Sequence, residues 1–84
     1  MWYVYILRCE DGALYTGSTT DVQARLKRHR AGRGSSYVRQ HGAAKVVYTE
    51  TYAGKSQVLK RELEIKGWDR HKKLAPLKAM HAAL

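Results

Sequence analysis

One carboxylate in this sequence is turned toward the core by the helical pattern around it. Three apolar residues lie within about 60° of Glu62 on a helical wheel, namely Val58, Leu59 and Ile65. Glu64 falls on the opposite side, where a helix glutamate normally meets solvent. Burying an ionised carboxylate costs several kcal/mol unless it is paired or binds a cation. Glu62 is therefore predicted to hold either a divalent metal ion or a basic side chain, and the wheel supports both interpretations equally.

An arginine and a histidine lie one turn apart on an earlier helix. Val22, Arg25, Leu26 and His29 follow the i, i+3, i+4, i+7 spacing of one helix face. Arg25 and His29 then lie along the edge of the stripe that faces the sheet. For an isolated pair, a snorkelling arginine and a hydrogen-bonded boundary histidine are the more common interpretation, so the spacing alone assigns no chemistry.

Two tyrosines are predicted to share one face of a hairpin. Residues 2–9 and 14–18 are strand-like and flank a Glu-Asp-Gly turn signal. Pairing across this turn places Gly17 opposite Tyr5 and puts Tyr15 on the same face, because side chains alternate along a strand. Gly17 leaves space beside the Tyr5 ring.

Further elements must hold these groups in place. Thr20 to Gln23 matches a capping box and predicts a helix to about Ala31. The pattern then predicts a short ordered piece at residues 37–40, a strand at 44–52, in which Val46 and Tyr48 alternate with polar neighbours, and a helix at about 56–66 that ends at Gly67. Asp69 can cap a further helical piece, which Pro76 limits.

A strongly basic composition points to a polyanionic partner. Sixteen Lys and Arg against seven Asp and Glu give a net charge of +9. Between Arg25 and Lys45 there is no acidic residue. The predicted nucleic-acid-binding residues in this run are Lys27, Arg28, Arg30, Arg33, Arg39 and Lys45, with Tyr37 available to stack on a base. The alternative is a solvated surface that only aids solubility.

The remaining sequence features limit the classes of protein to which this chain can belong. Eighty-four residues are expected to form one domain, 1–84. The longest apolar run is too short to span a bilayer and no secretory signal is visible, so a cytoplasmic location without membrane contact is expected. The single cysteine, Cys9, has neither a disulfide partner nor zinc-site spacing. Motifs of serine hydrolases, zinc proteases and nucleotide-binding proteins are absent from the sequence.

Taken in order, these residues resemble the GIY-YIG endonucleases, in particular their small bacterial single-domain members. Tyr3-Val4-Tyr5 stands in the place of the first triplet and Tyr15-Thr16-Gly17 in that of the second, followed by Arg25 and Glu62. The resemblance implies an α+β fold, a three-stranded antiparallel sheet flanked by helices, with the tyrosines, arginine and glutamate meeting on one side. Ser18 stands where many relatives carry lysine, and the chain contains no asparagine.

The resemblance also implies a reaction. A Mg²⁺ or Mn²⁺ ion held by Glu62 would assist hydrolysis of a phosphodiester, and Arg25 would pair with a phosphate oxygen. Tyr5, Tyr15 or His29 would orient or deprotonate the attacking water. DNA is the expected substrate, with nicked, branched and single-stranded forms as the candidates, and RNA stays open. The alternative is a nucleic-acid-binding module of the same fold with little or no catalysis.

Overall fold

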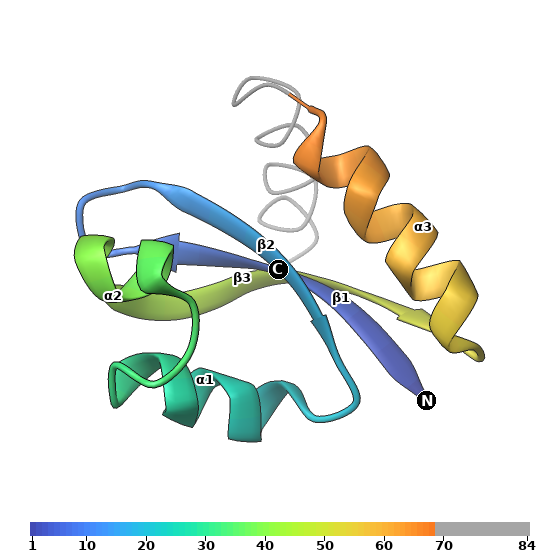
Figure 1. Cartoon of the computed structure of the whole chain (residues 1–84), viewed down its shortest axis with the longest axis horizontal. Coiled ribbons are helices and arrows are strands. Elements are labelled where there is room, and N and C mark those ends of the chain that lie inside the picture. Colours follow the sequence, from blue (N-terminus) through green and yellow to red (C-terminus); the bar gives the residue numbers. More distant parts are fainter. Residues whose placement is uncertain (69–84) are drawn as a thin grey trace.

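The computed structural model describes residues 1–68 as a three-stranded sheet with three helices (Figure 1). In chain order the elements are β1 (Trp2–Cys9), β2 (Leu14–Thr19), α1 (Val22–Arg30), α2 (Ser36–His41), β3 (Ala43–Tyr52) and α3 (Lys55–Lys66). Both strand pairs are antiparallel and the strand order is β2-β1-β3. The predicted α+β fold is confirmed. The helical piece predicted after Asp69 and limited by Pro76 lies outside the described residues.

The hairpin has the predicted register. The Cys9 amide donates to the Ala13 carbonyl at 2.8 Å, and Gly12 in the turn has a φ of 88°, which favours glycine. Tyr5 consequently pairs with Gly17, as the turn predicts. A short local signal therefore sets which side chains of β1 and β2 share a face.

Strand β1 is buried on both faces, so it forms the centre of two clusters. The cluster under α3 consists of Val4, Ile6, Val58 and Ile65. The cluster on the side of α1 and α2 consists of Tyr5, Leu7 and Val38. Figure 1 shows α3 and α1 on opposite sides of the sheet. A strand covered on both sides needs apolar residues at successive positions, which explains the aromatic and aliphatic run of β1.

The alternation predicted along β3 is interrupted by a bulge. Ile6 pairs with Tyr48 whereas Leu7 pairs with Val46, so Val47 is an extra residue in the ladder. Val46 packs on the cluster beside α1, and Tyr48 packs on the cluster under α3. The bulge therefore places these two side chains on opposite faces, which a strict period of two cannot predict.

The start of α1 also differs from the prediction. Asp21, not Thr20, is the N-cap, and its carboxylate accepts from the Ala24 amide at 3.0 Å. The Thr19 hydroxyl accepts from the Asp21 amide at 3.1 Å and holds the chain in a turn just before the helix. The helix begins one residue later because aspartate is at least as good a cap as threonine.

A hydrogen-bonded clamp joins β3 to α3. Glu50 accepts from the Tyr48 hydroxyl at 2.5 Å and the Tyr52 hydroxyl at 2.7 Å. The Arg61 guanidinium donates to the two Glu50 oxygens at 2.8 and 3.0 Å, as a fork. We call this set of four residues the Glu50 clamp. Since the Glu50 side chain is only 18% exposed, the pairing is little screened by solvent.

The Glu50 clamp makes stability depend on acid pH. The Arg61 hydrogen bonds are the main cause that lowers the pKa of Glu50 from 4.5 to about 2. The unfolded chain therefore takes up this proton first as the pH falls. Stability from this group is present above pH 4.5 and is lost toward pH 2, by about 3 kcal/mol. Urea unfolding across this range should show the stability of the wild type converging on that of Glu50→Gln. If the difference in unfolding free energy between the wild type and Glu50→Gln stays constant with pH, the lowered pKa of Glu50 is contradicted.

Candidate active site

A tyrosine and a histidine from different elements meet in the interior. The Tyr5 hydroxyl on β1 lies 2.9 Å from Nε2 of His29 on α1, and both side chains are buried. Nδ1 of His29 is also buried and has no hydrogen-bond partner among the described residues. The structure thus brings together two of the residues to which the sequence could assign no contact.

Gly17 lets the Tyr5 phenol reach the edge of the sheet. An ideal Cβ built on Gly17 would lie 2.5 Å from the Tyr5 hydroxyl oxygen and 2.6 Å from Cζ. These distances are far shorter than a carbon contact allows. The phenol therefore lies directly across edge strand β2, in the space that a side chain at position 17 would fill.

Gly17→Ala is expected to displace the Tyr5 ring. A buried ring cannot move as the end of a flexible side chain does, so the variant should lose about 1–3 kcal/mol of unfolding free energy. Thermal unfolding measures the loss. Gly54→Ala is the matched control, because the nearest atom to its new Cβ would be Oε1 of Gln57 at 3.7 Å, an ordinary contact. Equal stability of the two variants would contradict the close approach.

The surroundings keep the Tyr5–His29 pair neutral at pH 7. Burial is the main cause that raises the pKa of Tyr5 to about 12; Tyr15 adds to it, and Arg25 acts in the opposite direction through its charge and a hydrogen bond. Burial, helped by the charges of Arg25 and Arg28, lowers the pKa of His29 below 6.5. At neutral pH the proton therefore stays on the phenol oxygen, and the imidazole can accept one.

Glu62 lies inward and Glu64 outward, as the helical wheel predicts. Their side chains are 15% and 56% exposed. Val58 and Ile65 are fully buried, while Leu59 is 42% exposed and so lies at the rim of the apolar face.

Glu62 has two partners in the described part of the chain. Its Oε1 accepts a hydrogen bond from the Ser18 hydroxyl on β2, and Nζ of Lys66 lies 2.6 Å from its Oε2. Lys66 is 47% exposed, so this ion pair one turn along α3 is open to water. Ion pairs of this kind contribute only about 0.3–0.5 kcal/mol, which is too little to fix the carboxylate there against a competing cation.

The catalytic candidates do not meet on one face of the sheet, in contrast to what the resemblance implies. Ser18 pairs with Val4 and faces α3, whereas Gly17 pairs with Tyr5 and faces α1. The charge of Glu62 nevertheless contributes to the raised pKa of Tyr5. The Tyr5 phenol and the Glu62 carboxylate therefore reach adjacent residues of edge strand β2, Gly17 and Ser18, from opposite faces of the sheet.

Tyr15 connects this site to an aromatic row, by which we mean Tyr15, Tyr37 and His41. The Tyr15 ring meets His29 edge-on at 5.4 Å and stacks on Tyr37 at 6.0 Å, and Tyr37 contacts His41 at 4.4 Å. Nδ1 of His41 contacts the Asp11 carboxylate, which lowers the pKa of Asp11. The row leads from the Tyr5–His29 pair out to α2, where Tyr37 is 42% exposed.

The predicted basic residues are all exposed, and they occupy α1, α2, the segment between these helices and the start of β3. A hollow of about 400 Å³ between α1 and α2 has Arg30, Arg39, His29 and Glu10 among its lining residues. Two arginines beside the buried histidine suit a phosphate group.

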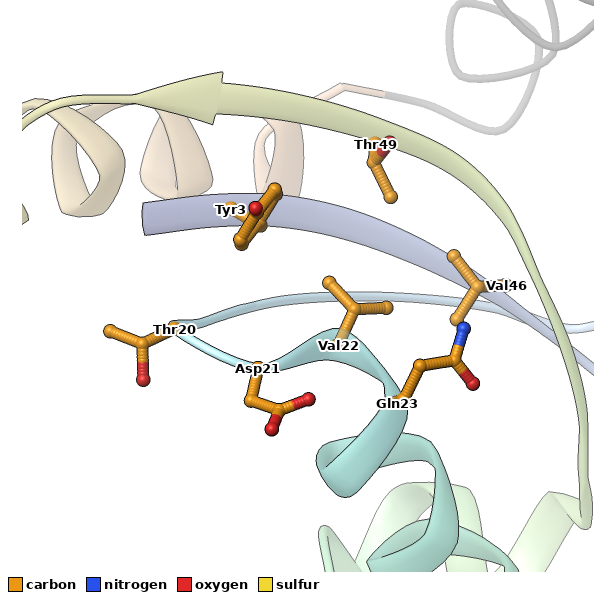
Figure 2. Close-up of a pocket in the computed structure, with 7 residues that line it drawn as sticks. All are labelled: Tyr3, Thr20, Asp21, Val22, Gln23, Val46 and Thr49. Carbon is orange, nitrogen blue, oxygen red and sulfur yellow. The ribbon is translucent and has the colours of Figure 1, made fainter. Parts of the chain in front are cut away.

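A second hollow lies on the other side of α1. It has a volume of about 490 Å³ and lies between the start of α1 and the sheet (Figure 2). Its lining consists of Tyr3, Thr20, Asp21, Val22, Gln23, Val46 and Thr49. Since Asp21 is the only charged residue in this lining, the hollow does not suit a phosphate. The charges therefore favour the α2 side of α1 for a nucleic-acid backbone.

Comparison with known proteins identifies the family. A family model described as the GIY-YIG catalytic domain matches residues 1–75. The chain belongs to the GIY-YIG family. It is 47% identical over 76 residues to UPF0213 proteins of Staphylococcus aureus strains Mu3 and Mu50, which covers 90% of this chain and 93% of each relative. The solution NMR structure of the UPF0213 protein BH0048 from Bacillus halodurans shares 41% identity, with a TM-score of 0.59, over 94% of this chain and 85% of that chain.

The family match indicates a nuclease-type domain. In this GIY-YIG domain, residues 1–68 contain no group of three His, Cys, Asp or Glu side chains that could hold a metal ion. Mg²⁺ does not require such a cage, because it keeps several waters and is held by one or two carboxylates together with substrate phosphates. Glu62 at the edge of β2, beside the Ser18 hydroxyl, fits a site of this kind. In the same residues no helix is both long and apolar enough to cross a membrane.

Sequence reasoning missed the partners of these residues in the GIY-YIG domain. The sequence marks Ser18 only as a replacement for the lysine of many relatives, yet its hydroxyl donates to Glu62. The Glu50 clamp was not predicted, although a signal was present in the alternation of Tyr48, Glu50 and Tyr52 on one strand face. Three polar groups at i, i+2 and i+4 of a strand share a face and need a common partner.

Proposed function

We propose that this GIY-YIG domain is a divalent-metal-dependent endonuclease that hydrolyses phosphodiester bonds in DNA. The observation that carries the proposal is that the buried Tyr5–His29 pair and the inward Glu62 carboxylate reach adjacent residues of edge strand β2, Gly17 and Ser18, from opposite faces. A phenol, an imidazole and a carboxylate at one edge provide a path for a proton and a ligand for a cation, which are the two needs of phosphodiester hydrolysis.

The proton of the attacking water would leave through Tyr5 to His29. A phenol with a pKa of about 12 is not ionised at neutral pH, so it serves as a base only if its own proton moves on as the water proton arrives. Nε2 of His29, 2.9 Å away, accepts that proton when the ring carries its hydrogen on Nδ1. This assigns the base to the pair, and Tyr15 packs against His29 as the neighbouring ring.

Negative charge on the phosphate would be stabilised by two groups, one on each face of the sheet. Arg25 is half-buried and lowers the pKa of Tyr5 through its charge and a hydrogen bond, which supports a role close to the phenol. Its guanidinium would pair with an oxygen of the scissile phosphate. Glu62 would hold Mg²⁺ or Mn²⁺, which when bound supplies positive charge for the phosphate and the leaving oxygen. The metal ligand and the guanidinium belong to opposite faces of the sheet, so the strand to be cut would cross the edge of β2.

The DNA would extend from this edge over the exposed basic residues of α1 and α2. Arg30 and Arg39 line a shared hollow, and Tyr37 lies next to Tyr15, where a base can stack beside the row. Contacts of this kind do not recognise the base sequence, so the shape of the DNA would determine where it is cut. Nicked, branched and single-stranded DNA are therefore the substrates to test, with RNA of equal length beside them.

The test is a cleavage assay on these substrates with Mg²⁺, with Mn²⁺ and with chelator. Cleavage that requires the metal supports the proposal. Undiminished cleavage in chelator would reject the metal, and a protein that binds every substrate but cuts none would leave the second candidate, a binding module. The Lys66 ion pair favours that second candidate, because it gives the Glu62 carboxylate a partner without a metal ion.

Removing single arginines should weaken binding and also reduce its salt dependence. Arg28→Ala and Arg33→Ala each delete an exposed charge from the basic surface. If each contacts one phosphate, the slope of log K against log salt concentration should become shallower by about 1. Fluorescence anisotropy with labelled DNA at several salt concentrations measures this slope. Lys55→Ala is the control, since Lys55 lies over the Trp2 ring, away from α1 and α2, and an equal change there would argue against a localised surface.

A further inference from the structure

Two successive residues of α3 reach to opposite strands of the sheet. At about 100° per residue, Arg61 and Glu62 lie roughly 50° to either side of the line through Val58 and Ile65, which is buried against β1. Glu62 reaches Ser18 on β2, and Arg61 reaches Glu50 on β3. Ser18 and Glu50 both pair with Val4 of β1 from opposite sides. The two contacts therefore span the sheet at a single level.

Such a pair of contacts sets the rotation of the helix about its axis. The apolar contacts of Val58 and Ile65 are non-directional and tolerate a small roll of α3. The forked pairing of Arg61 with Glu50 does not tolerate such a roll, because two parallel hydrogen bonds require one orientation of the guanidinium. A roll that moved Glu62 away from Ser18 would break the fork on the other side.

We propose that Glu50 is a positioning residue for Glu62, acting through Arg61 and the orientation of α3. The inference rests on the proposed function, since it concerns the geometry of the proposed metal ligand. Glu50 has no place of its own in the reaction, because all its oxygens are engaged by Tyr48, Tyr52 and Arg61. Arg61 is additionally held by Glu64 of α3 at 3.1 Å and by the Trp68 ring, just after α3, at 4.9 Å, so the clamp has further anchors beyond β3.

The test measures Mn²⁺ binding to the full chain by electron paramagnetic resonance, without nucleic acid. Glu50→Gln and Arg61→Lys should each weaken Mn²⁺ binding by about tenfold, as expected when an orienting partner of a ligand is lost. Arg61→Lys keeps the charge but cannot form the fork. Val47→Ala, which removes apolar packing under the same helix, serves as the stability control and should bind Mn²⁺ as the wild type does.

The outcomes separate the inference from the proposed function. Wild-type affinity in both clamp variants, with Glu62→Ala unable to bind, would overturn the positioning role while leaving the metal site in place. Equal weakening in Val47→Ala would also overturn it, because general loosening would then explain the loss. If the wild type binds no Mn²⁺, the metal assignment fails, and the inference, which rests on it, fails with it.

Discussion

Replacing Glu62 by alanine is expected to lower the rate of metal-dependent DNA cleavage by about 1,000-fold, which corresponds to about 4 kcal/mol of lost transition-state stabilisation. The loss should be in kcat more than in KM, because the carboxylate would act on charge that develops during the reaction. Steady-state cleavage of a nicked or branched DNA, with Mg²⁺ varied, measures both. DNA binding without metal should persist, since the basic surface lies on other elements.

Two control variants distinguish a metal ligand from a structural salt bridge at Glu62. Glu64→Ala removes a carboxylate two residues away that is 56% exposed, and it should cut nearly as the wild type does. Lys66→Met removes the other half of the ion pair. If Glu62 serves only that pair, Lys66→Met and Glu62→Ala should have equal effects. If Glu62 is a ligand, Lys66→Met should retain cleavage and need less Mg²⁺, because a competing cation is gone.

Tyr5→Phe is expected to reduce cleavage by at least about 100-fold, the usual contribution of a positioned acid or base. The change deletes the hydroxyl that lies 2.9 Å from His29 and leaves the ring to fill the space over Gly17. Single-turnover cleavage measures the chemical step. Tyr3→Phe removes a phenol hydroxyl two residues earlier on the same strand, at the second hollow, and serves as a control for the loss of a phenol. Similar decreases in the single-turnover rate of both variants would argue against proton transfer from Tyr5 to His29.

The pH dependence of the wild type should follow His29. The pKa of His29 lies below 6.5, mainly because of burial, so the ring is neutral and able to accept a proton at pH 7. The cleavage rate should stay level from pH 7 down to about 6.5 and fall at lower pH as the ring becomes protonated. The stability of the fold should fall in the same direction, because the unfolded chain binds this proton at a higher pH than the folded one. A rate that rises as the pH drops below 6.5 would contradict His29 as the acceptor.

Local patterns were sufficient to predict several parts of this protein. The turn at residues 10–12 predicted the register that pairs Tyr5 with Gly17, because a short turn leaves few ways to align two strands. The helical wheel predicted that Glu62 lies inward and Glu64 outward, because a helix repeats every few residues whatever surrounds it. The residue types and their order also carried the family resemblance that the match over residues 1–75 confirms.

Contacts between distant elements could not be predicted from the sequence, because each depends on how two elements pack. The sequence left open whether His29 is a boundary residue or part of a site, and packing of α1 against the sheet brought it to Tyr5. The bulge at Val47 depends on the alignment of two strands separated by more than thirty residues. The resemblance implied that the candidate residues meet on one side of the sheet, but α3 lies on the opposite face from α1, so Tyr5 and Glu62 reach β2 from opposite faces. Only the tertiary structure decides this, since the arrangement of layers follows from burying two apolar faces of β1 at once.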